Sequence, residues 1–223
     1  MSYETMSDFF AARVEGYDEH MLENVGGCKE GYKKLATLIP KGTIKLLDLG
    51  CGTGLELDEI FKVLPDIEVT GIDLTKAMLD KLKAKHPDKA LTLIHGNYFE
   101  YDLGREQYDV AISFQTMHHF SHEDKVQLYK KIYTSLKPGG KYIECDYMVE
   151  SQEEEDHWYS MNAQIRRELH IPEGVFYHYD TPCTIVNQKK LFQLSGFSQV
   201  RALWRKENTT IMIGKKVKNS PLL

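Results

Sequence analysis

Long hydrophobic segments are absent from this sequence of 223 residues. Its longest apolar runs are no longer than a β-strand, whereas a membrane-spanning helix needs ~20 consecutive apolar residues. The N-terminus also lacks the basic, apolar and small-residue regions of a secretory signal. We therefore expect a soluble, cytoplasmic protein that makes no contact with a membrane.

Cysteine is scarce, and the spacing of the cysteines argues against a CxxC redox motif and against a zinc site. The four cysteines are Cys28, Cys51, Cys145 and Cys183. They form no CxxC pair and do not have the spacing of a zinc site. We expect free, buried thiols in a reducing compartment.

Positive charge is in deficit, because the formal net charge is -5 at pH 7. A net negative protein repels a phosphate backbone, so we expect no nucleic-acid partner.

Hydrophobic residues make up 42% of the chain and charged residues 27%, which argues against a disordered chain or a coiled coil. The length fits one domain.

Strand-like and helix-like segments alternate along most of the chain. Strands are expected at 44–49, 68–72, 91–95, 108–114 and 141–146. Helices are expected at 5–24, 28–39, 55–64, 76–85, 125–136 and 187–195, and the last of them leads into an antiparallel hairpin of strands 198–205 and 209–216. Because alternating strands and helices pair in parallel, the sequence predicts an α/β fold. Its doubly wound, mostly parallel sheet should have seven strands and a terminal antiparallel hairpin.

A single domain over 1–223 is expected to carry two additions, a helical segment at 1–40 and an inserted lid at 147–183. The insert interrupts the alternation and is rich in acidic and aromatic residues. Its acidic run, 153–156, should face water, since burying unpaired carboxylates is costly. Its aromatic side chains should wall a ligand pocket. They are Trp158, Tyr159, Phe176, Tyr177 and Tyr179.

A glycine-rich loop follows the first predicted strand and opens a helix. Glycine is needed where the backbone turns sharply or touches a ligand, and the free N–H groups of a helix start can hold an anionic group. Asp73 ends the next strand, where its carboxylate can accept hydrogen bonds from ribose hydroxyls. Together these features predict an adenosine-containing ligand.

The spacing of the loop and its charge indicate which ligand. The glycines are Gly50, Gly52 and Gly54, whereas a dinucleotide loop has the pattern G-x-G-x-x-G. Asp48 lies beside the loop, where a carboxylate repels a pyrophosphate and suits an ammonium group. S-adenosylmethionine carries such a group, so we expect it rather than NAD.

Several segments resemble the motifs of class I, Rossmann-like S-adenosylmethionine-dependent methyltransferases of the small-molecule type. The resemblance covers about 40–146 and 184–216, and it is carried by Asp48 to Gly54, Gly71-Ile72-Asp73-Leu74, Gly96-Asn97-Tyr98, Tyr108 to Ser113, Leu136-Lys137-Pro138-Gly139-Gly140 and Gly196 to Val200. It implies that Asp48 supports the ammonium group, that Asp73 holds the ribose, and that the adenine lies beside Leu74, Asn97 and Tyr98. The full expected cofactor-binding set is Arg13, Asp48, Gly50, Cys51, Gly52, Gly54, Asp73, Leu74, Asn97, Tyr98 and Phe114.

The N-terminal segment resembles the element that closes over the cofactor in many such enzymes. Phe10, Arg13 and Tyr17 have the spacing of one helical face, Arg13 could meet the methionine carboxylate, and Tyr17 is a catalytic candidate. The alternative is an amphipathic helix packed on the sheet, with Arg13 in solvent.

His118 and His119 follow the fourth strand, and either could act as a general base. The alternative is a structural histidine pair. A metal site that includes His122 has no supporting carboxylate, because Glu123 and Asp124 fit the first turn of a helix. We therefore expect no metal.

The sequence predicts methyl transfer from S-adenosylmethionine to a small-molecule acceptor, with S-adenosylhomocysteine as the product. An RNA or protein methyltransferase, a non-catalytic S-adenosylmethionine-binding protein and an NAD-dependent oxidoreductase are the alternatives. The identity of the acceptor, the attacked atom and the oligomeric state are left open.

Overall fold

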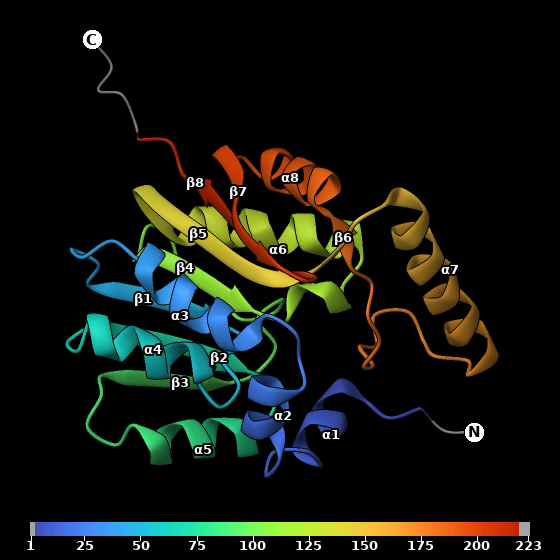
Figure 1. Cartoon of the computed structure of the whole chain (residues 1–223), viewed down its shortest axis with the longest axis horizontal. Helices are drawn as coiled ribbons and strands as arrows, with labels where there is room; N and C mark the ends of the chain where they lie inside the picture. The colour runs from blue at the N-terminus through green and yellow to red at the C-terminus, as the bar shows by residue number, and fades with distance from the viewer. Residues whose placement is uncertain (1–2, 219–223) are drawn as a thin grey trace.

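The computed structural model describes residues 3–218, and it contains one extended β-sheet with helices on both faces (Figure 1). The strand order is β3-β2-β1-β4-β5-β8-β7, and a two-residue strand, β6, pairs with β5 beside this path. The strands are β1 (Lys45–Leu49), β2 (Glu68–Asp73), β3 (Leu91–His95), β4 (Tyr108–Phe114), β5 (Leu136–Val149), β6 (Cys183–Thr184), β7 (Ser198–Lys206) and β8 (Thr209–Lys215).

The first five strands are parallel to one another, and β8 and β7 form an antiparallel hairpin against β5. The predicted fold class is confirmed. All seven expected strands are present, and β5 is longer than predicted because Leu136 pairs with Tyr108 of β4 at one end and Met148 and Val149 pair with β6 at the other. The two-residue β6 is an addition that the sequence did not predict.

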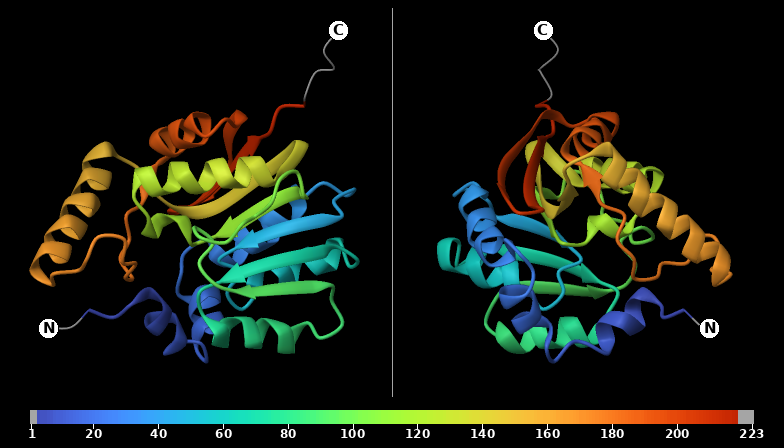
Figure 2. Two further views of the ribbon diagram at one scale, coloured as in Figure 1. Left: turned by 180° about the vertical axis from the view of Figure 1, so that it is seen from behind. Right: turned by 45° about the vertical axis from the view of Figure 1, so that its right-hand side comes forward.

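Helices cover the two faces of the sheet (Figures 1 and 2). The helices α3 and α4 lie on one face, and α6 and α8 lie on the other. The helices are α1 (Met6–Ala11), α2 (Tyr17–Glu23), α3 (Cys28–Leu38), α4 (Leu55–Val63), α5 (Lys76–Lys85), α6 (His122–Ser135), α7 (Gln152–Glu168) and α8 (Ile185–Leu194), and η1 (Met117–His119) is a single 3-10 turn.

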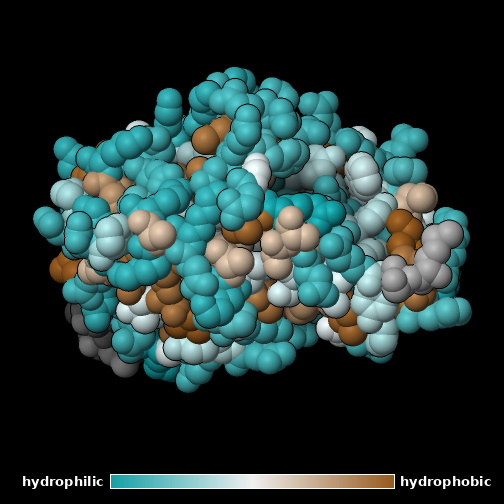
Figure 3. Space-filling view, turned by 90° about the horizontal axis from the view of Figure 1, so that it is seen from below, coloured by the Kyte–Doolittle hydropathy of each residue, from teal (hydrophilic) through white to brown (hydrophobic). Residues whose placement is uncertain are grey.

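Alternation of side chains along β4 explains why the sheet has two cores. Val110, Ile112 and Phe114 belong to the core that contains α3 and α4, whereas Ala111 belongs to the core beneath α6 and α8. Successive strand residues point to opposite faces, so a strand covered on both sides is apolar throughout. Because the apolar residues are largely inside these two cores, hydrophilic residues cover most of the face shown in Figure 3. Apolar side chains are exposed there only in small groups.

The predicted helix at 5–24 is wrong in one respect, because it is divided into α1 and α2 by a turn at 12–16. Gly16 ends this turn and is the cap residue before α2. Its position outside both helices agrees with the low helix propensity of glycine. The turn lets Phe10 of α1 and Tyr17 of α2 meet edge to face, with ring centroids 6.1 Å apart.

The segment 147–183 contains the 17-residue helix α7, which begins at the cap Ser151. Together with α1 and α2, α7 lies beyond the carboxyl ends of the parallel strands (Figure 1). No helix within residues 3–218 has the length and apolar character needed to cross a membrane. Residues 1–2 and 219–223 of the expected 1–223 domain lie outside the described part.

Candidate active site

The glycine loop after β1 is held in a conformation that favours glycine. Gly50, Gly52 and Gly54 have φ angles of 71°, 46° and 75°, where a Cβ atom is strained. A Cβ on Gly54 would also lie 2.4 Å from a methyl carbon of Leu82. These glycines therefore shape the turn, in which the N–H groups of Gly50 and Gly54 donate to the carbonyl oxygens of Ile72 and Cys51, each at 2.8 Å.

Asp73 lies directly against this loop, as the sequence predicts. One oxygen of its carboxylate accepts a hydrogen bond from the N–H of Gly52 at 2.9 Å, and the other accepts one from the N–H of Thr75 at 2.8 Å. The two contacts fix the carboxylate at the carboxyl end of β2, next to the open loop.

Asp48 is fully buried beneath the loop and forms an acidic pair with Glu56 of α4. Within residues 3–218, neither carboxylate oxygen of Asp48 has a hydrogen-bond partner. Burial raises the pKa of Asp48 to about 7, and burial together with Asp48 raises the pKa of Glu56 well above its usual value. Both pKa shifts favour the protonated carboxyl groups, and a positively charged ligand beside the pair would favour the ionised form.

Among the residues expected around the adenine, Tyr98 is buried and its hydroxyl lies 3.2 Å from that of Thr116. Leu74 is partly buried. Asn97 stabilises a turn, since its side-chain oxygen accepts from the N–H of Phe99 and its amide donates to Glu100. Its side chain therefore has local partners in this structure.

Two expected cofactor residues place their side chains in the core. Cys51 is buried against Gly71, and a Cβ on Gly71 would lie 2.8 Å from the sulfur. Phe114 stacks on Tyr32 of α3, with ring centroids 3.8 Å apart. Both side chains therefore pack between the sheet and its helices, and the expectation that Cys51 and Phe114 bind the cofactor stays a prediction.

The N-terminal segment covers the loop. The ring of Tyr17 lies over Gly52, with Cε1 3.9 Å from the position of a Cβ there. The side chain of Asp18 accepts a hydrogen bond from the hydroxyl of Thr53 at 2.5 Å. Arg13 is half exposed and stacks on Phe9, and its guanidinium bonds the carbonyl of that residue at 2.7 Å. Arg13 is thus at the site, but its guanidinium has local partners.

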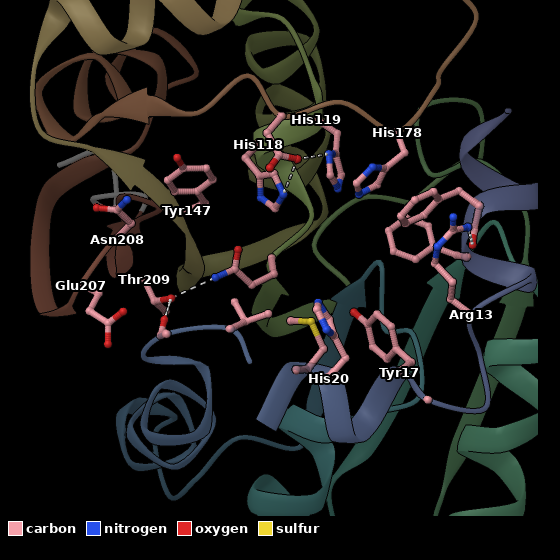
Figure 4. A pocket seen from close by; sticks show the side chains of 18 residues that line it. Arg13, Tyr17, His20, His118, His119, Tyr147, His178, Glu207, Asn208 and Thr209 are labelled. Carbon is pink, nitrogen blue, oxygen red and sulfur yellow. Dashed lines mark hydrogen bonds and ion pairs between the residues drawn. The ribbon is translucent and has the colours of Figure 1, made fainter. Parts of the chain in front are cut away.

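A cavity of about 780 Å³ opens beside Tyr17 (Figure 4). Its lining comes from α1, α2, the segment after β4, the end of β5, the insert and the β7–β8 turn. The lining residues are Phe9, Phe10, Arg13, Gly16, Tyr17, His20, Met21, Val25, Gly26, Gln115, His118, His119, Tyr147, His178, Asp180, Glu207, Asn208 and Thr209.

Three histidines stand along one wall of this cavity, His118, His119 and His178 (Figure 4). His118 Nδ1 bonds the buried carboxylate of Asp146 at the end of β5. Asp180 Oδ1 lies 3.5 Å from His118 Nε2 and 3.4 Å from His119 Nδ1. The two histidines expected from the sequence therefore lie in a larger cluster.

The charges of this cluster depend on its neighbours. Burial lowers the pKa of His118, but the carboxylate of Asp146 outweighs burial and raises it above the usual value. Burial and the nearby His118 lower the pKa of His119, and burial lowers that of His178 to about 4. Burial raises the pKa of Asp180, but the neighbouring imidazoles outweigh it and lower that pKa well below its usual range.

Sequence reasoning missed Asp146, Asp180 and Gln115. Asp146 could have been found, because it ends the predicted strand 141–146 at the edge of the sheet where ligands bind. Gln115 has the strained φ of 50° and donates a hydrogen bond to Thr209 at 3.1 Å. No local pattern identifies Asp180, which lies in the irregular part of the insert.

One expectation about the insert is wrong, and a second, that its acidic run faces water, fails at one residue. None of the five aromatic residues expected to wall the pocket lines the cavity, and the insert contributes Tyr147, His178 and Asp180 instead. Glu155 of the acidic run is buried, because its carboxylate accepts from the N–H of Thr184 at 2.5 Å and lies 2.9 Å from His122 Nε2. These partners stabilise a carboxylate that would otherwise require water.

Comparison with known proteins agrees with this geometry. Residues 46–140 match the family described as a methyltransferase domain. A malonyl-acyl-carrier-protein O-methyltransferase of Priestia megaterium is 33% identical over 134 residues, which cover 60% of this chain and 48% of that protein. A carboxy-S-adenosyl-L-methionine synthase of Nautilia profundicola is 25% identical over 182 residues, which cover 77% of each protein.

The structure of human N-acetylserotonin methyltransferase superposes with a TM-score of 0.65 and 17% identity, over 95% of this chain and 55% of that chain. This chain thus spans about half the length of the Priestia and human proteins.

The strand order, the glycine loop and its acidic partner agree with the predicted fold of a class I S-adenosylmethionine-dependent methyltransferase. The match to the methyltransferase-domain family spans residues 46–140. The prediction of a methyltransferase domain is confirmed for this part of the chain.

Proposed function

We propose that the whole protein transfers a methyl group from S-adenosylmethionine to a small-molecule acceptor bound in the cavity beside the glycine loop. The observation that carries this proposal is the position of the cavity at the carboxyl ends of the parallel strands, where open α/β sheets bind ligands. A volume of about 780 Å³ suits a small molecule. The net charge of -5 argues against a nucleic-acid substrate.

The glycine loop and its acidic neighbours fit S-adenosylmethionine. The carboxylate oxygens of Asp48 lack partners within residues 3–218, and an ammonium group at the loop would supply the missing positive charge. Asp73 accepts two N–H bonds, and a carboxylate has further lone pairs for ribose hydroxyls. The carboxylates of Asp48 and Asp73 beside the loop would repel a pyrophosphate.

We assign the acceptor side to Tyr17 and the histidine wall. S-adenosylmethionine supplies a methyl group on a positively charged sulfur, so the main task of the chain is to align the acceptor. Tyr17 covers the loop where the two ligands would meet, and His118 and His119 face the cavity from the opposite wall (Figure 4). An imidazole there can receive a proton from the acceptor.

We further propose that 1–40 and 147–183 act as a cap of a single domain. Both contribute to the cavity lining, and their backbones meet where the N–H of Met6 donates to the carbonyl of Phe176 at 3.2 Å. Ser7 also donates to the carbonyl of Leu74 at 3.3 Å. Closure over bound ligands would exclude water from the site.

The relatives are named for different reactions, an O-methylation of malonyl carrier protein and the synthesis of carboxy-S-adenosylmethionine. Our proposal therefore names a class of acceptor. Calorimetry with S-adenosylhomocysteine and with NAD tests the cofactor site. Transfer of labelled methyl groups to fractionated metabolites and to bulk tRNA tests the acceptor class, and useful incorporation into tRNA would overturn the proposal.

A further inference from the structure

Three potential metal-ligand atoms converge on one point of the cavity wall. They are His118 Nε2, His119 Nδ1 and Asp180 Oδ1, and all lie within 4.8 Å of one another. The Asp180 oxygen is buried and has no hydrogen-bond partner among the described residues 3–218. A buried carboxylate oxygen without a hydrogen-bond partner is costly, and a cation bound at this point would stabilise it.

The separations within the group suit two ligands of one ion better than a hydrogen bond. Asp180 Oδ1 lies 3.5 Å from His118 Nε2 and 3.4 Å from His119 Nδ1, beyond the usual range of an N–H···O bond. Two ligands bound at 2.0–2.1 Å in a tetrahedral site lie about 3.3 Å apart, as geometry requires of zinc bond lengths. The two separations are close to that value.

His118 has the support that a metal ligand needs. Its Nδ1 bonds Asp146, which leaves Nε2 to face Asp180. Asp146 is itself fixed, because its carboxylate accepts from the N–H groups of Met117 at 2.8 Å and Tyr147 at 2.7 Å. A carboxylate behind a histidine fixes the ring and makes it a stronger ligand.

The imidazole of His119 has one hydrogen-bond partner that competes with metal binding. His119 Nδ1 lies 3.3 Å from the carbonyl oxygen of Tyr179, so metal binding requires the tautomer with its proton on Nε2. His178 stands beside His119, with ring centroids 5.0 Å apart, and stacks on Phe9 at 3.6 Å. His178 thus lies next to His119 on the same wall of the cavity.

We propose that His118, His119 and Asp180 bind one divalent transition-metal ion of the zinc type, with its remaining position open to the cavity. Two imidazoles and a carboxylate are a ligand set of catalytic metal sites, which keep a position for water or substrate. The proposal rests on the proposed function, because the cavity is where we place the acceptor. The ion would lower the pKa of an acceptor hydroxyl or thiol that binds to it.

A second group of potential ligands serves as an internal comparison. His122, Glu155 and Cys183 also lie close together. There, however, the sulfur of Cys183 has the ammonium of Lys125 at 3.1 Å, and Glu155 accepts from the N–H of Thr184 at 2.5 Å. The ammonium group of Lys125 therefore lies within this second group, where it would repel a divalent ion.

The test is zinc and cobalt binding to the full chain after chelator treatment. Calorimetry with Zn²⁺ alone should give one site, and Co²⁺ should give the visible spectrum of a tetrahedral site. Asp180→Asn should weaken binding at least tenfold, as expected on loss of a ligand. The matched control His122→Gln should leave binding unchanged. Asp180 is one-third exposed, so its variant should remain folded, and circular dichroism checks this.

Absence of Zn²⁺ binding, equal binding by Asp180→Asn, or loss of binding in His122→Gln would each overturn the metal site. S-adenosylhomocysteine binding and methyl transfer are measured on the same samples. Methyl transfer to a small molecule by a protein that binds no metal would overturn this inference alone. Metal binding together with methylation of RNA would overturn the proposed function alone.

Discussion

Glu155→Gln tests how the insert is attached to the body of the protein. The carboxylate of Glu155 lies 2.9 Å from His122 Nε2 of α6, and it accepts hydrogen bonds from Thr184 at 2.5 Å and from Asn187 at 2.9 Å. One side chain of α7 thus joins α6 and the start of α8. Glutamine keeps the size and one acceptor oxygen but removes the negative charge.

The expected loss of folding stability follows from how far Glu155 and His122 are each exposed to water. The side chain of Glu155 is 1% exposed, and removal of one partner from a fully buried ion pair costs about 3–5 kcal/mol. The side chain of His122 is 36% exposed, so water screens part of the interaction. We therefore expect Glu155→Gln to reduce the free energy of unfolding by about 1–3 kcal/mol.

The effect should depend on pH with a defined sign. The neighbouring Cys183 and Glu155 raise the pKa of His122 from 6.5 to about 9, so its contribution is complete below pH 6.5 and is lost as the pH rises through 9. Burial raises the pKa of Glu155, but His122 and the N–H donors outweigh it and lower that pKa from 4.5 to about 2. Its contribution is present above pH 4.5 and is lost as the pH falls through 2.

Urea unfolding of the wild-type protein and the variant at a series of pH values measures both quantities. The difference should be largest between pH 4.5 and 6.5 and should shrink toward pH 10. Glu153→Gln, at an exposed position of the same helix, is the matched control and should change stability by less than about 0.5 kcal/mol. A loss for Glu155→Gln below that limit, or one that grows at high pH, would refute the reasoning.

Three further predictions concern the cofactor site and its cover. Asp73→Ala should weaken S-adenosylhomocysteine binding by about 1–3 kcal/mol in calorimetry, and unchanged affinity would contradict its role. Gly54→Ala should lower the thermal midpoint by an amount equivalent to about 1–2 kcal/mol, because its φ is 75° and a Cβ would meet Leu82; an unaltered midpoint would show that the loop relaxes. In hydrogen exchange, 5–20 and 147–183 should gain protection together when S-adenosylhomocysteine binds, and the cap proposal fails if neither responds.

The fold was largely predictable from the sequence because its strands are short and buried on both faces. In β4, the run Val110-Ala111-Ile112 has no polar residue, and the structure shows helices on both sides of it. The glycine loop and Asp73 were predictable for a different reason. Both depend on local backbone geometry and on the ends of parallel strands, which sequence order determines directly.

The acceptor side was less predictable because it depends on contacts between distant segments. Asp180 approaches His118 and His119 only after the insert folds back from α7 to β6. Likewise, Phe114 turns into the core because Tyr32 of α3 stacks on it. Neither contact can be predicted from the local pattern of apolar and polar residues. The sequence therefore identified the two histidines but not the carboxylate of Asp180 beside them.

The most direct test of the account is the fate of a labelled methyl group. The purified protein is incubated with methyl-labelled S-adenosylmethionine and a cell extract that has been separated into small molecules, protein and RNA. We predict incorporation into the small-molecule fraction, and loss of that incorporation in Asp73→Ala. Incorporation into RNA or protein instead would contradict the proposed acceptor class, and absence of incorporation from every fraction would contradict the proposed enzyme.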